Sequence, residues 1–234
     1  MKSVVIHRIA VAMSLLLLVA GVVAYLYLQH SRISQPEISP LYSLVPSDAT
    51  TVVETDDVVA FVDDVSDGSL ANADLPVSDM VDCLRNYVHD FLEASPHGLS
   101  TQLSRVLLSY HQPENPVNQI LYCSVDEADD AASFQEFFTR YFQNPVGEPE
   151  VINFKGEDIA VYQLADGHEL SAYLTDNLLA LSFSNKLLQQ VIEAQQQSGT
   201  LSSNAAFMDL QNAKSSFVRT AVYQQKDNRW EMIY

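Results

Sequence analysis

Glycine and basic residues are scarce in this 234-residue chain, and each scarcity excludes a class of function. The seven glycines stand singly, so the sequence contains no glycine-rich loop that could cradle a nucleotide phosphate. Twelve Lys and Arg residues oppose 30 Asp and Glu residues, which gives a formal net charge of −18. A field of that sign repels phosphates, so we predict neither a nucleic-acid partner nor a nucleotide.

Motifs for metal ions and for hydrolysis are also lacking. The sequence has no G-x-S-x-G and no H-E-x-x-H pattern. Asp63, Asp67 and Gly68 match three positions of a calcium loop, but Val65 stands where another oxygen ligand is required. We therefore predict no metal and no cofactor, and we assign no catalytic residue.

Cysteine is represented by Cys83 and Cys123 alone. A disulfide between them is one interpretation, because it would close a long loop in a domain outside the reducing cytoplasm. The other is that both are free and buried, since Cys83 falls on the apolar side of a predicted helix and Cys123 within a predicted strand. The second interpretation is favoured.

One long apolar run is present, at residues 9–28, and it carries no charge. Its length suits a helix that crosses about 30 Å of hydrocarbon, so it predicts a single transmembrane helix. A cleaved signal peptide is the alternative, although its apolar region is normally shorter. Lys2 and Arg8 before the run favour a cytoplasmic N-terminus.

This assignment predicts an order of segments along the chain. Residues 1–8 form a cytoplasmic tail, residues 29–45 a linker with prolines and serines, and residues 46–234 an extracytoplasmic domain. The expected location is the bacterial inner membrane, as a single-pass signal-anchor protein with a periplasmic domain and the lipid bilayer as a partner. The expected fold class is α+β.

Within the domain, apolar periodicity predicts a mainly antiparallel sheet with four or five helices. Strands are expected at residues 50–55, 103–110, 119–125, 157–164, 168–175, 178–184 and 217–223. Helices are expected near residues 57–65, 78–93, 134–142 and 187–192, the first of them capped by Asp56 or Asp57. Three segments repeat the order strand, polar turn, helix, so the fold is expected to be built from such units, with internal duplication as a possibility.

The segments "LVPSDATTVVETDDVVAFVDDV" and "YLTDNLLALSFSNKLLQQVIEAQQQ", the latter followed by Phe207, resemble a domain-of-unknown-function family of single-pass bacterial envelope proteins. The positions that carry the likeness are Pro46, Asp48, Ala49 and residues 182–187. This resemblance implies an envelope location and the same α+β fold. It implies no catalytic residues.

Two groups of side chains merit attention as candidate sites. Residues 45–65 hold six carboxylates, of which most fit a turn, a helix cap or a wet helix face, whereas Glu54 lies unexplained inside a predicted strand. The second group is an aromatic helix face, interpreted as core packing or as a partner surface. Its members are Phe134, Phe137, Phe138, Tyr141 and Phe142.

The function expected from these features is that of a membrane-anchored envelope module that binds or scaffolds an envelope protein. One alternative is an envelope enzyme with an unrecognised carboxylate site that uses Asp48 or Glu54. Another is a truncated fragment of a longer protein, because the ending "QQKDNRWEMIY" follows the last predicted strand without a helix.

Overall fold

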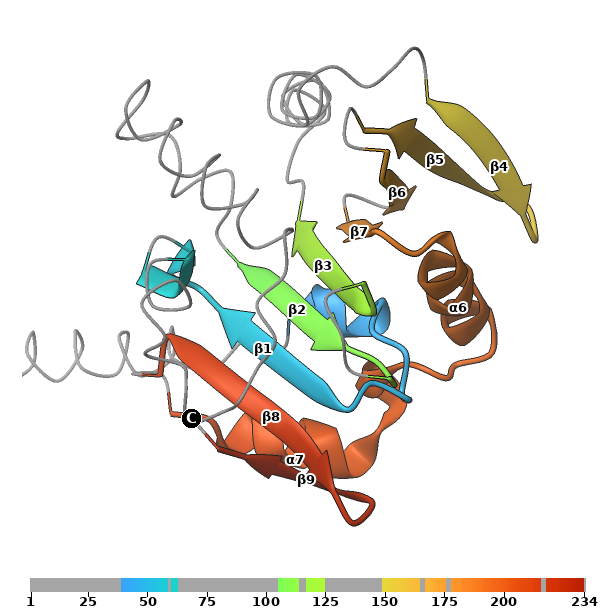
Figure 1. Ribbon diagram of the computed structural model, residues 1–234. Helices are drawn as coiled ribbons and strands as arrows, with labels where there is room; N and C mark the ends of the chain where they lie inside the picture. The colour runs from blue at the N-terminus through green and yellow to red at the C-terminus, as the bar shows by residue number, and fades with distance from the viewer. Residues whose placement is uncertain are drawn as a thin grey trace, which may run out of the picture. The chain divides into compact units, whose positions relative to one another are not determined.

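A nine-stranded antiparallel sheet is the framework of the part of the chain that the structure describes (Figure 1). The structure is a computed structural model that describes residues 39–58, 60–62, 105–113, 117–124, 149–164, 167–175, 178–215 and 218–233. All of these residues belong to one compact unit, Ile38–Tyr234.

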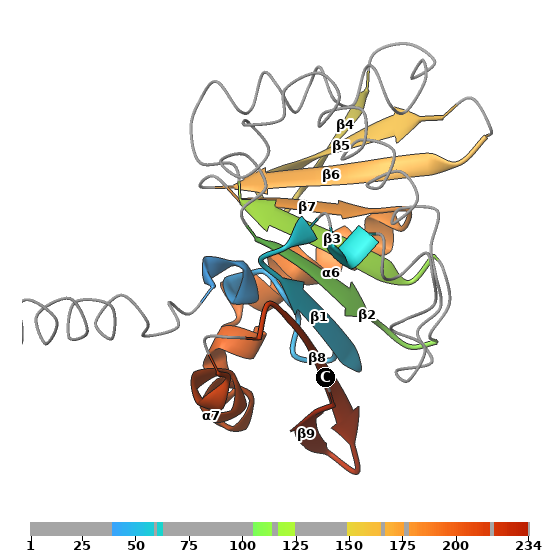
Figure 2. The same ribbon diagram turned by 90° about the vertical axis from the view of Figure 1, so that its left-hand side faces the viewer.

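The strands lie in the order β4-β5-β6-β7-β3-β2-β1-β8-β9, which Figure 2 shows from one edge of the sheet to the other. Their bounds are β1 Thr51–Thr55, β2 Val106–Tyr110, β3 Gln119–Ser124, β4 Glu150–Phe154, β5 Glu157–Gln163, β6 Glu169–Thr175, β7 Leu178–Ser182, β8 Thr220–Lys226 and β9 Arg229–Met232. Neighbouring strands of the sheet are consecutive in sequence except at two joints, where β3 lies beside β7 and β1 beside β8. The first strand is thus an inner strand.

Two-residue turns form the outer hairpins of the sheet. Lys155 and Gly156 between β4 and β5 both have positive φ, and so do Asp227 and Asn228 between β8 and β9. Positive φ at both central residues defines the type I′ turn, whose twist matches that of the flanking strands. Neither β4 nor β9 was predicted from the sequence.

One face of the sheet is covered by four short helical elements. These are η1 Pro40–Ser43, α6 Asn185–Gln196, η3 Leu201–Ser203 and α7 Ala205–Ala213. The α6 helix packs on β3, β5, β6 and β7, while α7 packs on β9 and η3. At the start of α7 the side chain of Asn204 accepts a hydrogen bond from the Phe207 amide at 3.1 Å, which caps the helix.

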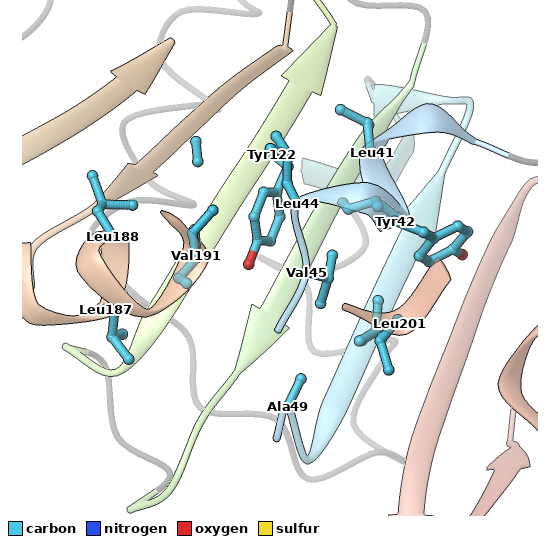
Figure 3. Packing of buried hydrophobic residues seen from close by; sticks show 14 of the residues in the cluster. Leu41, Tyr42, Leu44, Val45, Ala49, Tyr122, Leu187, Leu188, Val191 and Leu201 are labelled. Atoms are coloured by element: carbon cyan, nitrogen blue, oxygen red, sulfur yellow. The ribbon is translucent and has the colours of Figure 1, made fainter. Parts of the chain in front are cut away.

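The core lies between these helices and the sheet. Figure 3 shows Tyr122 of β3 between the side chains of α6 on one side and those of η1 on the other, with Leu201 of η3 near Tyr42. The inner strands β1 and β2 are buried along their whole length, whereas every residue of β4 is exposed or half-buried. Burial therefore falls from the middle of the sheet to its β4 edge.

Several predicted elements are confirmed. The strands near residues 50–55, 119–125, 157–164, 168–175 and 178–184 are present as β1, β3, β5, β6 and β7, and residues 187–192 lie in α6. Asp57 caps the helical residues after β1, because its carboxylate oxygen Oδ1 accepts the Ala60 amide at 3.2 Å. The helices expected near residues 78–93 and 134–142 lie outside the described residues.

The expected architecture, an α+β domain behind an N-terminal transmembrane helix, is wrong. The described residues form mainly a nine-stranded antiparallel sheet with α6, α7 and two 3-10 helices. Turns with positive φ add hairpin strands at both edges of this sheet, which helical and strand periodicity did not reveal.

The expected membrane crossing is also corrected. Among the described residues no helix is long and apolar enough to span a bilayer, which overturns the predictions of a single-pass signal-anchor protein and of an inner-membrane location with a periplasmic domain. The prediction rested on the length and apolar character of residues 9–28, which say what a segment could do if it were helical. Residues 9–28 lie outside the described residues.

Two segments have other roles than their sequences suggested. Leu41, Tyr42, Leu44 and Val45, which fell in the expected linker, are fully buried members of the core. Near the other end, the expected truncated ending contains β9, which pairs with β8 through the turn described above. The core therefore uses residues from both parts.

Candidate functional site

Glu54 is the centre of a buried ion cluster beneath α7. It lies in β1 and is fully buried, and its Oε2 accepts a hydrogen bond from Lys214 Nζ at 2.8 Å. The other oxygen, Oε1, is 3.7 Å from Arg105 Nε. Lys214 follows α7 and Arg105 precedes β2, so the carboxylate joins three separate segments of the chain.

A ring of aromatic side chains packs around Phe207 next to this cluster. The Phe207 ring meets Tyr42, Tyr223 and Trp230 edge to face, with centroids 5.0 to 5.1 Å apart. Burial raises the pKa of both tyrosine hydroxyls, and the negative charge of Glu54 raises the pKa of each further. Both hydroxyls therefore stay protonated near neutral pH.

The unexplained strand carboxylate is thereby accounted for. A buried carboxylate needs a cationic partner and hydrogen bonds, and Lys214 and Arg105 supply the positive charge. The arrangement fixes the end of α7 and the start of β2 on β1. Its chemistry is that of an internal ion pair.

A second feature is a series of polar side chains that runs from the surface to the core through β2 and β3. Asp48 Oδ1 lies 3.4 Å from His111 Nδ1, His111 Nε2 lies 2.9 Å from Ser109 Oγ, and Ser109 Oγ lies 3.0 Å from Tyr122 OH. The side chain of Asp48 is 63% exposed, whereas that of His111 is 3% exposed. Ser109 and Tyr122 are fully buried.

The order of these atoms is that of a serine-hydrolase triad, with the carboxylate at Nδ1 and the hydroxyl at Nε2. The burial of the two ends is the opposite of that in a hydrolase, however. A nucleophilic serine must meet substrate, but Ser109 is fully buried and its oxygen is shared with Tyr122, while the carboxylate end faces water. We interpret this series of polar contacts, here called the polar tie, as a structural link between the segment before β1 and the sheet.

The exposed end of this tie is held ionised. Contact with the His111 imidazole lowers the pKa of the Asp48 carboxyl, and partial burial opposes that effect without cancelling it. At the buried end, desolvation raises the pKa of Tyr122 above its ordinary value. The two carboxylates proposed for an enzyme, Asp48 and Glu54, thus have separate partners.

The third feature is the free edge of the sheet at β4. On its outer side β4 has no neighbouring strand among the described residues. Hydrogen-bonded pairs alternate along an antiparallel ladder, and the residues beside a two-residue turn form such a pair. Phe154 stands beside that turn, so Val151 and Asn153 direct their backbone N–H and C=O groups outward.

Apolar side chains accompany these open backbone groups. Val151 is 61% exposed, and Leu174 of β6, on the same face of the sheet, is 51% exposed. On the opposite face Ile152 and Phe154 are partly buried against the core. The β4 edge therefore combines unused hydrogen-bonding groups with accessible apolar surface.

The remaining predicted site residues are placed as follows. Cys123 is a free, buried thiol in β3, and burial raises its pKa to about 12. Cys83 lies outside the described residues, and so does the whole aromatic face at residues 134–142. Within the described part of the chain no group of three or more His, Cys, Asp or Glu side chains could hold a metal ion.

Comparisons with known proteins show a weak structural likeness. No protein-family model and no curated protein matches the chain. Two crystal forms of a protein named TP0453 match its structure, with TM-scores of 0.40 and 0.35 at 10% and 11% identity. The matches cover 82% and 81% of this chain, which spans 66% and 63% of those chains, less than two thirds of either. A likeness at these scores carries no argument about fold or function.

Proposed function

We propose that this protein is a binding module that takes up an extended segment of another protein by strand addition at β4. The observation that carries the proposal is the open outer side of β4 beside the exposed Val151. Strand addition uses main-chain hydrogen bonds for affinity and alternate side chains for specificity. The β4 edge offers both kinds of group.

The other edge strand supports this choice by contrast. Sheets protect their edges with short strands, charges, prolines or bulges, because an open edge pairs with other chains. β9 has four residues, and the charged Arg229 and Glu231 are both exposed. β4 has one charged residue, Glu150, and its remaining residues are V-I-N-F. Of these two edges, β4 is the one with fewer charged residues and the longer strand.

The occupant is a different protein rather than a second copy. Each chain carries a formal net charge of −18, so two copies repel each other on approach. A partner of neutral or positive charge meets no such barrier. We therefore expect the partner to be less acidic than this protein.

The test is a selection of random 12-residue peptides on the full chain, followed by binding to a Val151→Pro variant. Proline at this position removes an outward N–H group while the hydrogen bonds between β4 and β5 are kept. Selected peptides should lose at least about tenfold in affinity for Val151→Pro, because part of the added ladder is lost. They should bind Val151→Thr, the matched control, nearly as well as the wild type.

Amide hydrogen exchange supplies a second readout. On peptide binding, the amides of Val151 and Asn153 should become protected, since these are the groups that point outward. Unchanged affinity of the selected peptides for Val151→Pro, together with no protection at these two amides, would overturn the proposal. A Val151→Lys variant, which leaves the backbone unaltered, serves if the proline variant unfolds.

A further inference from the structure

We infer, on the basis of the proposed function, that the segment bound at β4 runs antiparallel to it and has the pattern apolar, basic, apolar, apolar, basic. The five positions lie opposite Phe154, Asn153, Ile152, Val151 and Glu150, in that order. Each requirement follows from what stands at the edge of the sheet.

The direction and the extent of the added strand follow from the backbone. The outward N–H and C=O groups of Val151 and Asn153 could pair with an added strand of either direction, and we assign the antiparallel one because antiparallel pairing is the more stable per residue. Pro149, directly before β4, has no N–H group, so this chain cannot donate a further hydrogen bond to the added strand at that end. Five partner residues therefore span the usable edge.

On the face with Val151, the two partner residues need different chemistry. A side chain opposite Val151 lies next to an exposed apolar group, which favours an apolar residue. A partner residue opposite Asn153 faces negative charge, because Asn153 pairs with Asp158 of β5 and its Nδ2 donates to Asp158 Oδ1 at 2.8 Å. The exposed carboxylate of Asp158 thus lies one strand away from the partner. A lysine or arginine is long enough to reach that carboxylate.

On the core face, three partner residues extend the existing layers. Ile152 and Phe154 already pack against the core from one side, so apolar residues opposite them would complete their burial. Glu150 is exposed at the far end of the strand, where a basic residue would stand directly opposite it. Opposite charges in such cross-strand pairs stabilise a sheet.

The charge of the surrounding hairpins reinforces the demand for basic residues. The described residues between 149 and 175 include Glu150, Glu157, Asp158 and Glu169 but a single cation, Lys155. The Lys155 ammonium is already paired with Glu193 at 2.7 Å. Because the described residues of this edge offer no further Lys or Arg, we assign the positive charge to the partner.

A second copy of β4 fits this pattern poorly. Paired antiparallel about Ile152, its own sequence E-V-I-N-F would place Glu150 opposite Phe154 and Val151 opposite Asn153, at both ends of the contact. A carboxylate would then cover the half-buried aromatic ring of each copy. The pattern inferred above has no such mismatch.

Two synthetic 12-residue peptides test the inference on the full chain, one with V-K-I-V-K and one with V-E-I-V-E at its centre, both with Gly-Ser flanks. We expect the basic peptide to bind about tenfold more tightly at low salt, since two attractive pairs replace two repulsive ones. The preference should shrink toward 1 M salt, where the Debye length falls to about 3 Å. It should also shrink in Asp158→Asn and Glu150→Gln, which keep the shape of each side chain.

The outcomes separate this inference from the proposed function. Equal binding of the two peptides, abolished for both by Val151→Pro, would overturn the inferred pattern and leave strand addition in place. Binding of selected peptides that is indifferent to Val151→Pro and leaves the amides of Val151 and Asn153 unprotected would overturn both. A wild-type chain that dimerises while Val151→Pro stays monomeric would identify a second copy as the occupant and would also overturn the inference.

Discussion

The inner strand β1 and the outer strand β4 are both five residues long, yet they differ in how their polar groups are satisfied. β1 pairs on both sides and is buried throughout, and its one charged side chain, Glu54, is bound within the molecule by Lys214. Among the described residues β4 pairs on one side, and Val151 and Glu150 are exposed. In the middle of the sheet the hydrogen-bonding and charged groups thus stabilise the fold. At the β4 edge the outward N–H and C=O groups of Val151 and Asn153 are available to a partner.

This difference predicts where substitutions affect folding and where they affect binding. The largest loss of stability is expected at Phe207, which is fully buried and meets three aromatic rings. Phe207→Ala should lower the free energy of unfolding by about 4 kcal/mol, because it removes apolar burial and leaves a cavity. Urea unfolding of both proteins measures the change.

The matched control is Phe207→Leu, which keeps most of the volume and should cost about 1 to 2 kcal/mol. Equal losses for the two variants would show that the edge-to-face contacts, rather than the filled volume, set the stability here.

A smaller loss is expected when the buried ion pair is broken. Lys214→Met leaves the Glu54 carboxylate buried with the more distant Arg105 as its remaining cation, and should cost about 3 kcal/mol. Replacing both partners, as Glu54→Leu with Lys214→Met, should restore most of that loss, because no unpaired carboxylate remains. A double-mutant cycle by urea unfolding measures the coupling.

That expectation depends on Arg105 being too far from Glu54 to replace Lys214. A loss below about 1 kcal/mol for Lys214→Met would show instead that Arg105 moves in to compensate.

The tie between Asp48 and His111 predicts a weaker, pH-dependent effect. Because the folded protein lowers the pKa of Asp48, the contribution of this group to stability is present above its unfolded pKa of about 3.9 and is lost as the pH falls through the folded pKa. Asp48→Asn should therefore be less stable than the wild type near pH 6, and the difference should shrink as the pH falls below the unfolded pKa of Asp48.

Urea unfolding at several pH values above and below the unfolded pKa of Asp48 checks this expectation. A difference that grows as the pH falls would contradict it, because it would require a raised pKa for Asp48 in the folded protein.

The smallest effect on stability is expected at the outer strand. Val151→Pro should change the free energy of unfolding by no more than about 0.5 kcal/mol, since the side chain is exposed and its backbone N–H faces outward. The same variant should lose peptide binding, as proposed above. A proline at Val53 of β1, where both neighbours use the backbone, is the contrasting control and should unfold the protein.

Local pattern accounts for the elements that were predicted correctly. Alternating apolar residues in the meander β5-β6-β7 and the stripe of α6 are local signals, and Asp57 is a local capping signal. β4 and β9 escaped prediction because β4 has no fully buried residue and β9 has a single one, Trp230, so neither shows a clear apolar pattern. Each becomes a strand because an ordered neighbour offers a free edge.

The candidate sites were recognisable from sequence only in part. Glu54 stood out as a carboxylate inside an apolar strand, but its partner Lys214 lies 160 positions further along the chain. His111 and Ser109 carried no signal, because their link to Asp48 depends on the path of the chain before β1. The exposure of Val151 likewise follows from the place of β4 at an edge.

What the sequence by itself determined about this protein is its acidic character, the lack of nucleotide, metal and hydrolase motifs in it, and the type of most inner strands. These properties depend on composition or on neighbouring residues. Only the tertiary structure decided that β1 pairs with β8, that Glu54 is neutralised and that β4 is an outer strand of the described sheet. Such features arise from contacts between distant segments, and their free energy is gained only when the whole sheet is assembled.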